Sequence, residues 1–573
     1  MSARSPIDRA ITVLAALVAA AYVLVLWRTA PDMGYTRDEG YYFKAAEEYA
    51  RWWGTLFSRR FLEAFGDPEI KLHFSYNTEH PALVKLSMGV THAIVKTWLG
   101  LAGDAQGYRA AGFLFGGLSL FATFLLGRAL VSPAAGLLAM GFLATHPRYF
   151  YDAHLACFDV AITAMWTLSL WAFWTGFAAP LGAPGRRRRI VRAGLVFGLA
   201  LATKLNALFL PVVFVATWLA TRPWRELRFG PGPSGSRELE LPRVPWVLLS
   251  CALIGPIVFV AHWPWLWHET IARIGFYVGF HLNHEHYPIS YFHTLFVKPP
   301  FPWHFSAVMT AVTVPGPMLA LGALGLVSSV GRVLFKRSPG DVLLVAATVL
   351  PIALIALPGT PIFGGVKHWY NAMPTLSILA ARALLSGAEA VAEGRARPAL
   401  GARVAAVLLG ALALAPGALG VRASHPHGIG FYNELAGGFR GGAELGMQRG
   451  FWSGLGGALV HALPRYLPRG GSVFFNRTNY DSYRMYQREG SLPTSVYYAN
   501  DAKAGAAAGL AYEQPEHAEK TGEIYSAIGP RPVAGVYQDD VALVQLHVRG
   551  LSERAPPDLV PPARTATGAP ASR

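Results

Sequence analysis

The feature that most constrains this chain is the alternation of long apolar runs with short basic loops. Hydrophobic residues make up 53% of the 573 positions and charged residues only 15%, whereas about a quarter of a soluble protein is charged. Runs of this length predict helices that cross a bilayer. Eleven such runs are found, at residues 10–27, 108–130, 134–147, 159–179, 190–203, 205–221, 244–262, 306–334, 341–357, 371–391 and 404–421. The sequence therefore predicts an all-α polytopic membrane protein.

The basic residues set the orientation of these spans. With the N-terminus in the cytoplasm, eleven spans place the run Arg186 to Arg189 and most other loop arginines in the cytoplasm, as the positive-inside rule requires. Residues 82–102 are also apolar, but Lys85, His92 and Lys96 recur at helical spacing, which predicts a helix lying along the interface. Counting 82–102 as a span would invert every later loop. The net charge of +16 therefore reflects topology and not nucleic-acid binding.

This topology divides the chain into a transmembrane module and a smaller domain. The module covers residues 1–421, with extracytoplasmic loops at about 28–107 and 263–305. Residues 422–555 are too polar for the membrane and contain strand-like runs at 472–476 and 541–548, which predict a small extracytoplasmic α/β domain. The Pro- and Ala-rich residues 556–573 predict a disordered tail.

An acidic pair opens the first outside loop, in Tyr35-Thr36-Arg37-Asp38-Glu39-Gly40-Tyr41-Tyr42. A carboxylate there could act as a general base that accepts a proton from a hydroxyl group. The alternative is structural: Asp38 would cap a helix over 39–53, with Glu39 in its first turn.

Two further acidic segments lie on the same side of the membrane. Glu79 and His80, before Pro81, could bind a divalent metal or a charged headgroup, or they could simply start a solvated helix. Asp152 follows Arg148, and Asp159 lies just inside the fourth span. An intramembrane carboxylate indicates a functional site, and a structural pair with Arg148 is the competing interpretation.

Basic and histidine-rich segments complete the set. Lys204 lies at the turn between two unusually short spans, where it could bind a lipid phosphate or extend to the interface. His262 opens the segment His262-Trp263-Pro264-Trp265, ahead of a histidine-rich stretch at 281–286. Many of these aromatic residues suit a membrane-interface belt. All of these clusters converge on one side of the membrane, which is a stronger signal than any single motif.

In order and spacing these motifs resemble the GT-C superfamily of membrane glycosyltransferases over residues 10–380. The most similar branches are the protein O-mannosyltransferases and the lipid A aminoarabinose transferases. The resemblance rests on the acidic pair, Glu79-His80-Pro81, Asp159, the Gly-Leu-Ala-Leu-Ala-Thr-Lys stretch at 198–204 and the His-Trp-Pro-Trp loop. Residues 430–438 also resemble a stretch that follows the last span in bacterial members.

The resemblance implies roles for individual residues. Asp38 would be the catalytic base with Glu39 beside it, and Lys204 would contact the donor phosphate together with Arg37, His80 and His262. Asp159, Asp152 and Tyr41 would line the substrate cavity. Glu79 and His262 match a divalent-metal pair of the aminoarabinose branch, whereas the mannosyltransferase branch does not rely on such a metal.

The implied activity is transfer of a monosaccharide from a polyprenyl-phosphate donor to a hydroxyl group, with inversion, at the outer face of a bacterial inner membrane. The acceptor could be a protein, a lipid or a glycan. Two other classes stay open: an oligosaccharide ligase or polymerase of related architecture, and a polytopic transporter. A transporter would need charged groups along a path through the membrane, whereas here they gather on one face.

Overall fold

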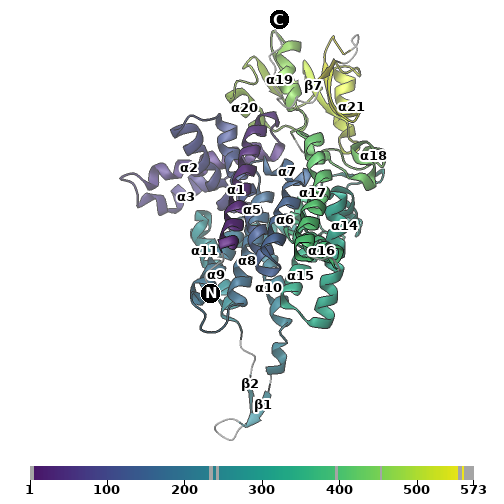
Figure 1. Ribbon diagram of the computed structural model, residues 1–573. Coiled ribbons are helices and arrows are strands. Elements are labelled where there is room, and N and C mark those ends of the chain that lie inside the picture. Colours follow the sequence, from purple (N-terminus) through teal and green to yellow (C-terminus); the bar gives the residue numbers. More distant parts are fainter. Residues whose placement is uncertain are drawn as a thin grey trace.

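A computed structural model shows a helical bundle that carries a small domain at one end (Figure 1). The structure describes residues 6–226, 228–231, 237–240, 244–393, 398–451, 454–552 and 558–560. The N-terminus and the hairpin of β1 (Arg228–Pro231) and β2 (Arg237–Glu240) lie toward the end of the bundle opposite the domain.

Eleven helices of the described residues correspond to the eleven predicted spans. They are α1 (Pro6–Thr29), α5 (Asp104–Leu130), α6 (Pro133–Ala144), α8 (Phe158–Phe177), α9 (Arg186–Leu201), α10 (Leu210–Leu219), α11 (Trp246–His262), α14 (Gly316–Gly331), α15 (Pro339–Ile355), α16 (Met373–Ala392) and α17 (Pro398–Ser424). Six of them are long and apolar enough to cross a membrane, and four more are shorter and apolar. The predicted all-α polytopic fold is confirmed.

One predicted span is interrupted, and the predicted non-spanning segment is helical. The predicted span 306–334 is two helices, α13 (Phe305–Thr313) and α14, which part at Val314 and Pro315 because proline has no amide hydrogen to continue the helical ladder. Residues 82–102 form α4 (Ala82–His92) and a π-helical turn from Ala93 to Trp98. This segment is not among the helices that could span a membrane, and it packs against α5.

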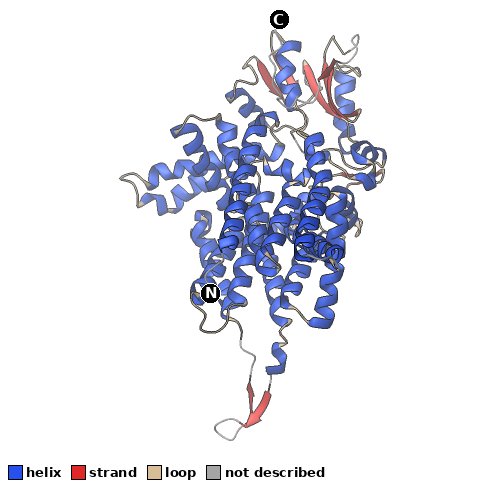
Figure 2. Cartoon of the chain, viewed as in Figure 1, coloured by secondary structure: helices blue, strands red, loops and turns tan. Residues whose placement is uncertain are grey.

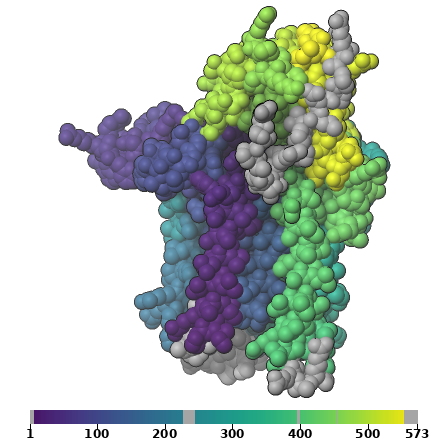
Figure 3. Space-filling model, turned by 45° about the horizontal axis from the view of Figure 1, so that its top comes forward, coloured from purple at the N-terminus to yellow at the C-terminus, as the bar shows by residue number. Residues whose placement is uncertain are grey.

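The outer surface of the bundle suits lipid. Figure 3 shows α1 as a continuous column along one face of the bundle. Its side chains Val13, Leu17 and Leu24 are more than half exposed, which would be unfavourable in water for so many large apolar groups on one helix. Inside the bundle, helices approach closely at small residues. A Cβ at Gly325 of α14 would lie 2.1 Å from the Leu379 carbonyl oxygen of α16.

The C-terminal part forms the predicted α/β domain, and its sheet holds most of the strands (Figure 2). The six strands run in the order β10-β8-β9-β7-β5-β6, with β9 antiparallel to β7 and β8 and the other pairs parallel. Their bounds are β5 Gly471–Phe474, β6 Val496–Ala499, β7 Ala508–Tyr512, β8 Ala534–Gln538, β9 Val541–Val548 and β10 Asp558–Val560. Helices α19 (Gly457–Tyr466), α20 (Tyr480–Arg488) and α21 (Ala518–Ala527) pack around the sheet. β10 falls within the predicted disordered tail, and the rest of 556–573 lies outside the described residues.

The two long loops contribute helices and strands at the same end as this domain. The first holds α2 (Arg37–Leu56) and α3 (Asp67–Phe74), which extend to one side of the bundle (Figure 1). The second holds α12 (Thr270–Leu282) and the short hairpin of β3 (Ile289–Tyr291) and β4 (Thr294–Phe296). Ser290 of β3 donates a hydrogen bond to Glu516 of the C-terminal domain at 2.6 Å, so the second loop is attached to this domain.

Candidate active site

A cavity of about 400 Å³ lies where the first loop, the second loop and the bundle meet. That volume is in the range of small-molecule binding sites. Seven of the predicted site residues line it: Arg37, Asp38, Tyr41, Glu79, His80, Asp159 and Lys204. Its charged lining consists of three cations, Arg37, Lys204 and Lys367, and three carboxylates, Asp38, Glu79 and Asp159. The predicted convergence of separate segments on one site is therefore seen in the structure.

Asp38 enters this cavity from the first turn of α2. The helix is capped by Thr36, whose side chain accepts a hydrogen bond from the Glu39 amide. The N-cap is thus Thr36 and not Asp38 as the structural alternative proposed. Asp38 is left available to pair with Lys367, whose Nζ lies 3.2 Å from Oδ2, and both side chains stay partly exposed to the cavity.

Lys204 lies opposite, at the interruption between α9 and α10. The chain leaves the helix at Ala202 and continues as a 3-10 turn from Leu205 to Phe209, so the predicted break between two short spans is present. The Lys204 Nζ lies 2.7 Å from Asp159 Oδ1, in the first turn of α8. Asp159 therefore pairs with Lys204 and not with Arg148, which instead donates a hydrogen bond to the Phe431 carbonyl oxygen at 2.8 Å.

Glu79 and His80 reach the cavity from a loop anchored by a buried lysine. The ammonium of Lys85 donates hydrogen bonds to the carbonyl oxygens of Asn77 and His80 at 2.6 and 2.8 Å. His80 stacks on Phe158, and burial lowers its pKa well below the usual range. A neutral imidazole at this place can orient a phosphate or hydroxyl group by one hydrogen bond, but it does not add a positive charge.

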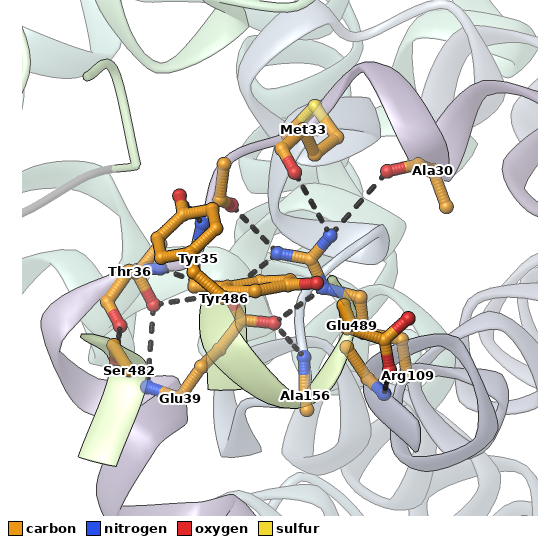
Figure 4. Close-up of polar contacts among 12 residues, drawn as sticks. Ala30, Met33, Tyr35, Thr36, Glu39, Arg109, Ala156, Ser482, Tyr486 and Glu489 are labelled. Carbon is orange, nitrogen blue, oxygen red and sulfur yellow. Dashed lines mark hydrogen bonds and ion pairs between the residues drawn. The ribbon is translucent and has the colours of Figure 1, made fainter. Parts of the chain in front are cut away.

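Glu39 is separate from the cavity, which corrects the prediction that it shares the catalytic role. It is completely buried and forms a two-point ion pair with Arg109 of α5, at 2.7 and 2.8 Å (Figure 4). Its carboxylate also accepts hydrogen bonds from the amides of Thr36 and Ala156. With its oxygen atoms fully occupied, Glu39 fixes the start of α2 and has no free lone pair directed at a substrate.

Asp152 and His262 lie outside the residues that line the main cavity. Asp152 borders a small adjoining pocket that also includes Asp38, Asp159 and Lys367, and it accepts a 2.5 Å hydrogen bond from Tyr370. His262 ends α11, and its Nε2 is buried without a hydrogen-bond partner among the described residues.

Of the predicted metal pair, Glu79 lines the main cavity and His262 is not among its lining residues. Within the described residues, no group of three or more His, Cys, Asp or Glu side chains is arranged to hold a metal ion.

Several lining residues lie outside the predicted set. Lys367 and His368 come from the start of the tenth span, and His281, His284 and Tyr287 come from the second loop. The guanidinium of Arg37 lies over the ring of Tyr287 at 5.6 Å. The sequence did contain a signal for these residues, because their basic and aromatic segments were predicted on the same side of the membrane as Asp38. Their distances from Asp38 could not be judged from the sequence.

Residues 93–250 match the family model of the dolichyl-phosphate-mannose-protein mannosyltransferases. The fold is similar to that of ArnT from Cupriavidus metallidurans bound to undecaprenyl phosphate, with 16% identity and a TM-score of 0.50 over 94% of this chain and 99% of that chain. The apo state of the same protein matches with 18% identity and a TM-score of 0.50, over 93% and 97%.

The archaeal oligosaccharyltransferase AglB from Archaeoglobus fulgidus, in complex with an inhibitory peptide and a dolichol-phosphate, matches at 15% identity and a TM-score of 0.46, over 72% of this chain and 56% of that chain. No curated protein matches the chain. The predicted GT-C fold is confirmed.

Replacing Glu39 by alanine is expected to destabilise the protein strongly. The change leaves the Arg109 guanidinium buried without its counter-ion, and breaking a buried pair in this way costs roughly 3–5 kcal/mol. Thermal unfolding of the purified protein in detergent measures the effect. The variant Glu444→Ala, which removes an exposed surface pair with Arg440, is the control and should change stability by less than about 1 kcal/mol. Equal stability of both variants would contradict a structural role for Glu39.

Asp152→Asn is expected to stabilise the protein at pH 8 more than at pH 5. Burial raises the pKa of Asp152 from its ordinary value of 3.8 to about 7. The protonated group therefore favours the folded state at low pH, and this contribution is lost as the pH rises toward 7, by at most about 1.4 kcal/mol per pH unit. Asparagine keeps an acceptor for Tyr370 and cannot ionise. Unfolding midpoints of both proteins at the two pH values test this, and a pH-independent difference would contradict it.

Proposed function

We propose that this protein is a membrane glycosyltransferase that transfers a monosaccharide from a polyprenyl-phosphate donor to an acceptor hydroxyl group, with inversion, at the extracytoplasmic face. The observation that carries the proposal is that one cavity holds a carboxylate, Asp38, together with the two lysines Lys204 and Lys367. The similarity in fold to ArnT, whose structure contains undecaprenyl phosphate, supports a donor of this class.

The donor phosphate would lie beside Lys204. Its ammonium is held at 2.7 Å by Asp159 and has further donor hydrogens for a phosphate oxygen. Lys367 and Arg37 add positive charge to the same cavity. Stabilising the negative charge that develops on a departing phosphate is the main requirement of this reaction, because a phosphate is a good leaving group and needs little help from an acid.

Asp38 would act on the acceptor. Its carboxylate takes the proton of the acceptor hydroxyl as that oxygen forms a bond to the anomeric carbon. The bond between this carbon and the phosphate oxygen breaks, and its electron pair leaves with the phosphate toward the lysines. Attack and departure on opposite sides of the sugar give inversion in a single displacement. The acceptor, whether a protein, a lipid or a glycan, would reach the cavity from the side of the two long loops.

The arrangement of the ends of the molecule supports the extracytoplasmic side for the proposed site. The domain end carries α2, and the opposite end carries the N-terminus and the hairpin between α10 and α11 (Figure 1). The basic run from Arg186 to Arg189 begins α9, and basic loops are retained in the cytoplasm.

Asp38→Asn is expected to abolish turnover while leaving donor binding nearly unchanged. The amide cannot accept the proton, so kcat should fall by about a hundredfold or more, within the range for loss of a general base. The measurement is transfer and release of lipid phosphate from a panel of radiolabelled polyprenyl-phosphate sugars, with and without a chelator. Lys204→Ala should instead weaken donor binding by about 10- to 100-fold. Normal turnover by Asp38→Asn would rule Asp38 out as the base.

Labelling of intact cells with a membrane-impermeant reagent is expected to show that the two ends of the molecule lie on opposite sides of the membrane. The native cysteines Cys157 and Cys251 are buried, so an introduced cysteine gives a clear signal. Lys503→Cys, on the exposed surface of the C-terminal domain, should react with a membrane-impermeant maleimide in intact cells. Arg187→Cys, at the exposed start of α9, should react only after permeabilisation. The reverse pattern would place the cavity on the cytoplasmic side and refute the proposed orientation.

A further inference from the structure

We infer that Asn479 and Ser482 of the C-terminal domain are positioning residues for the catalytic carboxylate, acting through the backbone of residues 36 and 37. The inference rests on the proposed function of Asp38 and assigns a role to the domain that lies on top of the bundle. Neither residue lines the cavity.

The segment before Asp38 is held from two sides (Figure 4). From the bundle, Arg109 donates hydrogen bonds to the carbonyl oxygens of Met33 and Gly34 at 3.2 and 2.7 Å. From the C-terminal domain, the hydroxyl of Tyr486 accepts a hydrogen bond from the Tyr35 amide at 2.8 Å. The ring of Tyr35 packs against that of Tyr486, with 4.3 Å between centroids.

Asn479 and Ser482 add two further hydrogen bonds to this segment, at the beginning of α2. Ser482 Oγ donates to the Thr36 carbonyl oxygen, and Asn479 Nδ2 donates to the Arg37 carbonyl oxygen, both at 2.8 Å. In a helix these carbonyl groups would normally accept only from amides one turn later. The additional bonds fix the peptide planes immediately before Asp38, and so they fix the direction in which its carboxylate points.

A glycine makes this contact possible. Gly40 lies on the face of α2 that meets α20, and a Cβ there would lie 2.1 Å from Asn479 Oδ1 and 2.5 Å from Ser482 Oγ. Glycine is otherwise unfavourable inside a helix. Its presence is explained by the close approach of the domain, which any larger side chain would push away.

The variant Asn479→Asp removes the hydrogen bond to the Arg37 carbonyl oxygen and keeps the bond that stabilises α20. The Asn479 side chain also caps α20 by accepting a hydrogen bond from the Ser482 amide at 2.7 Å. Aspartate keeps that cap and is favoured at a helix N-terminus, but it has no hydrogen to donate to the Arg37 carbonyl. Ser482→Ala removes the second bond, and Gly40→Ala displaces the domain while it favours the helical conformation of α2.

The experiment compares these three variants with the full-length protein in detergent. The matched control is Arg484→Ala, on the exposed side of α20. We expect kcat to fall on the order of 10- to 100-fold, the scale of a misplacement of about 1 Å. The KM for the donor and the binding of undecaprenyl phosphate should stay within about twofold of the parent protein, because the lysines are not disturbed. The unfolding midpoint should stay within a few degrees of the parent protein for Asn479→Asp and Ser482→Ala, whereas Gly40→Ala should lower it because it displaces the domain.

The outcomes distinguish the inference from its premise. Full activity of Asn479→Asp, Ser482→Ala and Gly40→Ala, with Asp38→Asn inactive, would overturn the positioning role and leave the proposed function intact. Parallel losses of kcat, donor binding and thermal stability would also overturn it, because they would indicate a general structural contribution. Normal turnover by Asp38→Asn would remove the premise that Asp38 is the base, whatever the three variants show. If Asn479→Asp does not fold, Ser482→Ala decides the question on the same three measurements.

Discussion

The ion pair between Glu39 and Arg109 is the interaction on which the rest of the site depends. Both side chains are almost entirely buried, and an unpaired charge at that depth would be strongly unfavourable. The guanidinium also binds the loop that connects α1 to α2 through its carbonyl oxygens. A single arginine near the start of α5 therefore sets the end of the first span, the turn that follows and the beginning of the helix that carries Asp38.

Ion pairs between distant segments also position the charged side chains of the cavity. Lys204 is held by Asp159, and Lys367 by Asp38, so each cation comes from one segment and its carboxylate from another. Such pairs keep polar groups satisfied near the membrane when no substrate is bound. They also place the cations where an incoming anion can share them. The one-sided collection of these groups distinguishes the molecule from a transporter, which needs charges along a continuous path.

Much of this could be predicted from the sequence because the relevant signals are local. Apolar runs define the spans, and residue types on one side of the membrane identify Asp38, Asp159 and Lys204. Adjacent residues on a helix point about 100° apart, so a sequence that shows Asp38 and Glu39 together cannot reveal that one faces the cavity and the other faces Arg109. Lys367 is 329 positions from its partner Asp38, and no sequence pattern from a single chain specifies that contact.

The hydrogen bonds that hold residues 33–37 from the bundle and from the C-terminal domain also affect the order in which the protein folds during synthesis. Tyr35 lies 451 positions before Tyr486, to which its amide is bonded. During synthesis the first span and the loop after it leave the ribosome long before α20 exists, and the bundle can assemble around them in the interim. The last bonds to this segment form only once the chain has been translated almost to its end. A nascent or shortened chain would therefore hold its spans in place and still lack the bonds that fix the segment before Asp38 from the side of the domain.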